Sequence, residues 1–224
     1  MFTIFNKTAA VILLAGLTFS SSVLANGYAS YHVTITNLTN SITFTPILVA
    51  SQRRVVSIYE LGSPASDDLT TIAESGDIGP LTTTLNGNHR VVDVQNSGGL
   101  LLPGKSVTVV VSAAHGARRI SIASMMLPTN DGFIALDSVR VPGHGSATFF
   151  SPGFDAGSEP NDELCTNIPG PTCGGVGLSP GENDGDEGYV HIHRGMHGIG
   201  DLAADVYDWR NPVARIMVTR VSSH

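Results

Sequence analysis

The sequence predicts an all-β protein, an antiparallel β-sandwich of about eight strands with one or two short helices. Three observations predict this fold: short segments alternate apolar and polar residues, they are rich in Thr, Val and Ile, and Gly, Pro or Asn ends each one. The segments are 31–39, 41–50, 105–113, 118–127, 132–139, 145–150, 188–194 and 213–221. Many short strands with little helix are typical of two packed sheets.

The strands differ in how clearly they are marked. In residues 31–39, Val33 and Ile35 alternate with threonines, which is the period-two pattern of a half-buried strand. In residues 41–50, Pro46 predicts a bulge or an edge position, because proline cannot donate to a sheet ladder. The segments 188–194 and 213–221 are the two strands expected late in the chain.

One stretch predicts a helix. In residues 62–77, a serine and a proline precede Asp67 and Asp68, Leu69 and Ile72 have helical spacing, and Gly76 follows. A serine cap, acidic residues in the first turn and a terminal glycine together mark a short helix. Residues 79–87 are expected to add one or two further turns.

The N-terminus has the features of a secretory signal peptide. Lys7 precedes an apolar run, and Val23 and Ala25 form a small-residue cleavage signal, so residues 1–25 are expected to be removed. The alternative, a spanning helix, needs about 20 apolar residues, more than this run supplies. Residues 26–224 are then one domain without a transmembrane anchor, exported to the periplasm or outside the cell.

Charge and cysteine content limit which partners and which cellular compartment the protein can have. The formal net charge of −7 and the absence of a basic run exclude a nucleic-acid footprint and favour cations as partners. Cys165 and Cys173 predict one disulfide that closes a small loop in an oxidising compartment. The alternative, a two-cysteine metal site, does not fit the Cys-x7-Cys spacing.

Residues 151–187 are rich in Gly, Pro and Asp and predict a long functional loop. Within it, Gly157 allows a positive φ that turns Asp155 and Glu159 to one side, and Asp131 can join them from another loop end. Carboxylate oxygens of this kind suit Ca²⁺. The alternative is a solvated acidic loop, and this interpretation is favoured for a second set of carboxylates. That set is Asp162, Glu163, Glu182, Asp184, Asp186 and Glu187.

Three motifs resemble the spondin N-terminal domain, in the form seen in exported bacterial proteins: SMMLPTNDGFIALD, FDAGSEPNDE and YDWRNPVARIMVTRV. The resemblance implies an eight-stranded sandwich similar to a C2 domain, a bound calcium ion, and a role in the extracellular matrix or cell adhesion. It also implies that Asp131, Asp155 and Glu159 are the calcium ligands. Two positions depart from the family: Gly132 replaces an aromatic residue, and Glu159 replaces an aspartate.

The histidines offer a second hypothesis. His191 and His193 are two apart on a predicted strand and so face one side, and His197 follows. Imidazoles in this arrangement can bind Zn²⁺ or Cu²⁺, as the His-x-His strand of copper–zinc superoxide dismutase does. The alternative is that these rings hydrogen-bond to neighbouring loops or carboxylates.

We therefore expect an exported, non-enzymatic calcium-binding module that mediates adhesion to an extracellular or cell-surface protein, glycan or lipid. The rival is a periplasmic copper or zinc protein, or a redox enzyme, centred on His191 and His193. The nucleophile elbow and nucleotide-binding fingerprints are absent from the sequence. Trp209 is expected to pack in the core, with Arg210 reaching a nearby acid.

Overall fold

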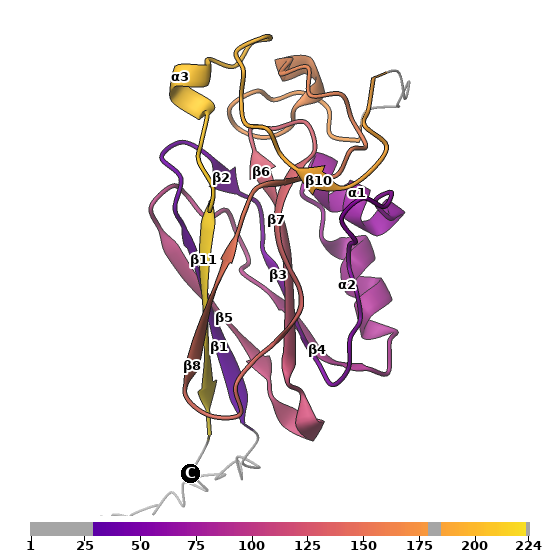
Figure 1. The fold of residues 1–224 in the computed structure, drawn as a ribbon, viewed down its shortest axis with the longest axis vertical. Helices are drawn as coiled ribbons and strands as arrows, with labels where there is room; N and C mark the ends of the chain where they lie inside the picture. Colours follow the sequence, from indigo (N-terminus) through magenta and orange to yellow (C-terminus); the bar gives the residue numbers. More distant parts are fainter. Residues whose placement is uncertain (1–28, 179–184, 223–224) are drawn as a thin grey trace, which may run out of the picture.

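Two antiparallel β-sheets form the protein in a computed structural model that describes residues 29–178 and 185–222. One sheet has the strand order β5-β1-β11-β8 and the other β10-β9-β7-β6-β3-β4, with β2 paired to β6 (Figure 1). The first sheet comprises β5 (Ser106–Ser112), β1 (Ser30–Asn37), β11 (Ala214–Val221) and β8 (Ser146–Ser151). The second comprises β10 (His191–Ile192), β9 (Phe154–Asp155), β7 (Gly132–Arg140), β6 (Arg119–Leu127), β3 (Leu48–Gln52), β4 (Val91–Asn96) and β2 (Thr43–Phe44). The predicted all-β sandwich is confirmed.

The first sheet follows the alternation in its sequence. In β1, Tyr31, Val33 and Ile35 are fully buried between the sheets, and His32, Thr34 and Thr36 alternate with them on the outer face. β1 lies between β5 and β11, and its residues pair in unbroken register with both neighbours. The apolar face of this sheet packs on the inner face of the second sheet, and together they form the main core.

The second sheet is buried on both faces because two helices cover its outer side (Figure 1). α1 (Asp67–Ser75) begins at Ser66, whose side chain accepts a hydrogen bond from the Leu69 amide, and ends at Gly76 with φ 72°. α2 (Gly79–Asn86) follows directly, and Leu81 and Leu85 pack on β3. Both predicted helices are confirmed, and they explain why β3 is continuously buried.

Some elements differ from the sequence prediction. Residues 188–194 were expected to form a strand, but only His191–Ile192 pair as β10. β4 was not predicted, since its residues are half-buried or exposed without alternation. Three short turns of helix were also unpredicted: η1 (Ala114–Gly116), η2 (Cys165–Asn167) and α3 (Ala204–Tyr207).

The predicted disulfide is present between Cys165 and Cys173, whose Cα atoms are 4.6 Å apart. Trp209 is buried against the main core, and Arg210 forms an ion pair with Asp208, as expected. Within the described ranges, no helix has the length and apolarity needed to cross a membrane. The predicted signal peptide, residues 1–25, lies outside the described residues.

Candidate metal centre

Three neighbouring strands bring carboxylates and imidazoles together at one end of the second sheet. β9 pairs with β7 on one side and with β10 on the other, so that Asp155 lies opposite both Gly132 and His191. Asp131 immediately precedes β7, and its carbonyl accepts a hydrogen bond from the Ala156 amide at 3.2 Å. We call this region the acidic end; it contains Asp131, Asp155, Glu159 and Glu187.

Asp131 is held by a tight turn between β6 and β7. The Thr129 hydroxyl donates to the Met126 carbonyl at 2.5 Å and accepts from the Gly132 amide at 2.9 Å. Asp131 is fully buried, and its Oδ2 accepts hydrogen bonds from the Ser158 and Glu159 amides at 2.8 and 3.2 Å. Its Oδ1 is buried without a hydrogen-bond partner. One oxygen therefore fixes the carboxylate, and the other is buried without a hydrogen-bond donor from the protein.

Asp155 is fixed in the same manner. It is fully buried, its Oδ1 accepts from the Gly157 amide at 2.8 Å, and its Oδ2 accepts from the Asn161 side chain at 2.8 Å. Gly157 has φ 64°, as its expected role in turning the chain requires. A Cβ at this position would lie 2.3 Å from the Tyr189 carbonyl oxygen, so close packing also requires glycine.

The two aspartates share an environment that disfavours their charge. Burial raises the pKa of Asp131 well above its usual range, and the neighbouring Asp155 charge raises it further. Burial likewise raises the pKa of Asp155, although the hydrogen bond from Asn161 and the proximity of His191 oppose this rise. No lysine or arginine forms an ion pair with either aspartate among the described residues. A cation would compensate this buried negative charge.

The two histidines have different hydrogen-bond roles. The Nδ1 of His191 lies 3.0 Å from the Ile192 carbonyl, which can only accept, so Nδ1 carries a proton. That Nε2 is buried without a hydrogen-bond partner, 3.4 Å from Asp155 Oδ1 and 3.8 Å from Glu187 Oε2. With Nδ1 donating to a carbonyl, Nε2 is the nitrogen through which His191 could bind a metal held between these carboxylates.

His193 has the opposite arrangement. Its Nδ1 accepts a hydrogen bond from the Gly195 amide at 3.0 Å, so the neutral ring carries its proton on Nε2. This nitrogen faces Asp155 Oδ2 at 3.9 Å. Burial, followed by the nearby His191 charge, lowers the pKa of His193 to about 3, so the ring is neutral at physiological pH. With Nε2 protonated, His193 is suited to orient Asp155 rather than to bind a metal.

The predicted ligand sets are therefore only partly brought together. Among the described residues, the three whose ligand atoms lie within 4.8 Å of one another are Asp155, Glu187 and His191. Glu159 is buried at the same end; burial raises the pKa of Glu74, and the Glu159 charge raises it further. His197 is exposed, and its backbone amide donates to Glu163 at 2.6 Å. It is not a member of this trio.

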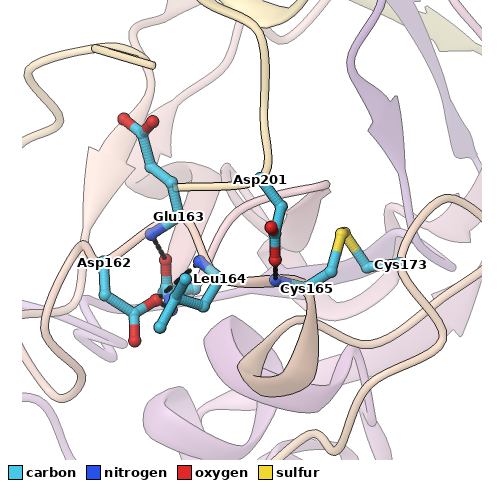
Figure 2. The surroundings of a disulfide bond; sticks show 7 residues. Asp162, Glu163, Leu164, Cys165, Cys173 and Asp201 are labelled. Carbon is cyan, nitrogen blue, oxygen red and sulfur yellow. Dashed lines mark hydrogen bonds between the residues drawn. A yellow bond between two sulfur atoms is a disulfide. The ribbon is translucent and has the colours of Figure 1, made fainter. Parts of the chain in front are cut away.

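The second set of carboxylates was expected to be solvated, and for Glu163 this interpretation is wrong; Glu182 and Asp184 of this set lie outside the described residues. Glu163 is buried, and its two oxygens accept from the His197 and Ile199 amides at 2.6 and 2.9 Å. Asp162 accepts from Asn130, Asn167 and the Leu164 amide. Figure 2 shows Asp162 and Glu163 beside the disulfide, where Asp201 accepts from the Cys165 amide at 2.9 Å. These carboxylates fix loops and are already satisfied.

Two acidic residues at this end were missed or undervalued. Glu187 was grouped with the solvated carboxylates, yet it belongs to the closest trio. Glu74 on α1 is buried, and burial raises its pKa to about 7, opposed by a hydrogen bond from Ser158. Glu74 lies on the apolar side of α1, whose other buried residues are Leu69, Ile72 and Ala73. This position in the helical pattern could have predicted from the sequence that Glu74 is buried.

A β-sandwich with a disulfide fits an extracellular-type domain. A comparison with protein families identifies it further: the model of the spondin N-terminal domain, Spondin_N, matches residues 28–147. The match covers more than half of the chain, which therefore belongs to the spondin N-terminal domain family. It includes Asp131 and Glu74 but ends before Asp155. A comparison with curated proteins finds no significant match.

Proposed function

We propose that this chain is an exported, non-enzymatic binding module whose acidic end holds a divalent cation, with Ca²⁺ as the first candidate. The family and the disulfide fit an exported module. The observation that supports the cation is the pair Asp131 and Asp155, fully buried side by side, with one oxygen of Asp131 lacking any partner. A divalent ion would convert the repulsion between these carboxylates into attraction.

The proposed ligands are Asp131, Asp155 and Glu159, with Glu187 as a further carboxylate. Asp131 comes from the β6–β7 turn, Asp155 and Glu159 from the chain around β9, and Glu187 from the chain before β10. A cation held by these groups would join three segments that are distant in sequence. The joined segments would present one surface to an extracellular or cell-surface protein, glycan or lipid.

A second candidate is a transition metal, and the orientation of His191 favours it. An imidazole nitrogen beside two carboxylates suits Zn²⁺ or Cu²⁺ better than Ca²⁺, which prefers oxygen ligands. In this version Asp155, Glu187 and His191 are the ligands. His193 orients Asp155 from the other side, and such partners of ligands affect metal affinity.

Calorimetric titration of the metal-free protein tests both candidates. Asp131→Asn is the sharpest variant because the substitution keeps the bonded Oδ2 and changes only the oxygen that lacks a partner. We expect Ca²⁺ to bind with a dissociation constant of about 10⁻³ M or tighter, and Asp131→Asn to weaken it by about tenfold or more. Asp205→Asn, an exposed carboxylate, is the matched control and should change nothing.

His191→Gln separates the two metals. If the site binds a transition metal, this variant loses Zn²⁺ affinity while Ca²⁺ affinity is unchanged, because only the nitrogen ligand is removed. If the site binds calcium through carboxylates, His191→Gln leaves Ca²⁺ binding intact and Asp131→Asn does not. The proposal fails if neither ion gives a heat of binding or a rise in Tm. Capture of surface material with and without a chelator then tests whether the partner depends on the ion.

A further inference from the structure

The opposite end of the second sheet collects arginines. The end of β3 and the end of β7 both lie beside the start of β6. The start of β4 lies there too, because the Arg53 amide, after β3, donates to the Arg90 carbonyl, before β4. Six of the ten arginines in the sequence lie at this meeting point, in a chain of net charge −7. We call it the arginine end; its members are Arg53, Arg54, Arg90, Arg118, Arg119 and Arg140.

Part of this end is hollowed. A surface hollow of about 520 Å³ is lined by Arg53, Arg54, His89 and Arg90. A second hollow of about 420 Å³ shares His89 and Arg90 with it. Its other lining residues are Thr83, Thr84, Gly87 and Asn88. The two hollows adjoin at His89 and Arg90, and we call them together the groove; their lining residues offer guanidinium, imidazole, hydroxyl and amide groups and no carboxylate.

The arginines of the groove are not neutralised by neighbours. In the described part of the chain, the arginine that forms an ion pair is Arg210, which lies on a different loop. The two aspartates near this end have other partners: Asp93 accepts from the Ser112 amide and Gln95, and Asp137 accepts from Ser57 and the Ile58 amide. All four residues that line the first hollow are exposed. Their positive charge therefore faces solvent.

Helix capping does not account for this cluster. Basic residues often gather at the C-terminal end of a helix, and α2 ends close by at Asn86. However, the last turn of α2 contains no basic residue, and its carbonyls are bonded by the Gly87 amide. The guanidinium of Arg53 donates instead to the His89 carbonyl at 2.5 Å, which connects Arg53 to the segment that follows α2.

We propose that this groove binds a saccharide polymer that carries sulfate or phosphate esters. Guanidinium groups match the geometry of such oxyanions and bind them with two parallel hydrogen bonds. A concave groove with hydroxyl and amide groups beside the arginines favours a saccharide over a membrane, since Thr83, Thr84 and Asn88 can pair with sugar hydroxyls. The site is independent of the acidic end and of any cation bound there.

Binding to dextran sulfate, measured by calorimetry with EDTA present, tests this proposal. We expect binding that weakens steeply with salt, and no binding to uncharged dextran. Arg53→Gln combined with Arg90→Gln should weaken binding by about tenfold or more and reduce the salt dependence. Lys105→Gln combined with Arg215→Gln, which removes two exposed charges outside the groove, should have little effect.

Two further measurements test the class of ligand and the contribution of guanidinium geometry to binding. Arg53→Lys combined with Arg90→Lys keeps the charge and loses the planar fork, so affinity should fall between that of the wild type and the glutamine variant. Vesicles of phosphatidylglycerol in phosphatidylcholine should bind more weakly than dextran sulfate. The proposal is overturned if the glutamine variant binds like the wild type, if dextran sulfate does not bind, or if the vesicles bind better.

Discussion

The two ends of the second sheet carry opposite charges, and the negative charges are buried whereas the positive charges are exposed. At the acidic end, Asp131 and Asp155 are fully buried and fixed by amide donors. At the arginine end, Arg53, Arg54 and Arg90 are exposed around a groove. Buried charge affects folding because it has lost its hydration, whereas exposed charge is screened and has little effect on stability. The first arrangement suits a small ion held inside, and the second a large anion bound outside.

The largest expected effect on stability lies in the loop of the acidic end. Gly157→Ala should destabilise the protein by about 3 kcal/mol or more, because alanine disfavours φ 64° and its Cβ would lie 2.3 Å from the Tyr189 carbonyl oxygen. Gly188→Ala is the matched control, since it has φ 76° but no atom within 4 Å of its Cβ. Denaturant unfolding should show the control losing only about 1 kcal/mol. Equal losses would mean that the contact with Tyr189 does not constrain this loop.

A smaller effect should appear in the pH dependence of the metal-free protein. The pKa of Glu74 is raised from 4.5 to about 7 in the folded state, so folding takes up a proton between these pH values. The contribution of Glu74 to the free energy of unfolding is therefore fully present below pH 4.5 and is lost as the pH rises through 7. The raised pKa values of Asp131 and Asp155 act in the same direction. From pH 4.5 to pH 7, the Tm of Glu74→Gln should decrease by about 2 °C less than the Tm of the wild type. An unchanged slope in this variant would exclude Glu74 as a contributor.

The smallest effect on stability is expected at the arginine end. Arg53→Gln combined with Arg90→Gln should change the free energy of unfolding by less than about 0.5 kcal/mol per site, because both side chains are exposed and form no ion pair in the described residues. Thermal unfolding at low and high salt measures this. A loss of several kcal/mol would show that the arginines support the fold and would break the contrast between the two ends.

Local sequence patterns predicted the features that depend on neighbours along the chain. The alternation in β1, the Ser66 cap and Gly76 end of α1, the Cys165–Cys173 disulfide and the positive φ of Gly157 were all predicted. Each depends on a period, a cap or a backbone preference that a short stretch reveals.

Features that depend on packing between distant segments were not predicted. Asp162 and Glu163 look solvated in sequence, yet Glu163 is buried because the amides of His197 and Ile199 come to it from a distant loop. The spacing of His191 and His193 predicted that the two rings face one side, but it did not predict that Nδ1 of His191 donates to the Ile192 carbonyl while Nδ1 of His193 accepts from the Gly195 amide. The family resemblance identified Asp131 and Asp155 as partners, while the approach of Glu187 depends on the fold alone.

Anomalous diffraction from crystals of the protein grown with Ca²⁺, and separately with Zn²⁺, tests the central claim most directly. We predict one strong peak at the acidic end in contact with Asp155, joined by Asp131 if the ion is calcium and by Glu187 and His191 if it is zinc. The account is contradicted if neither ion gives a peak there, or if the ion lies instead against Asp162 and Glu163, whose oxygens are already engaged by amides.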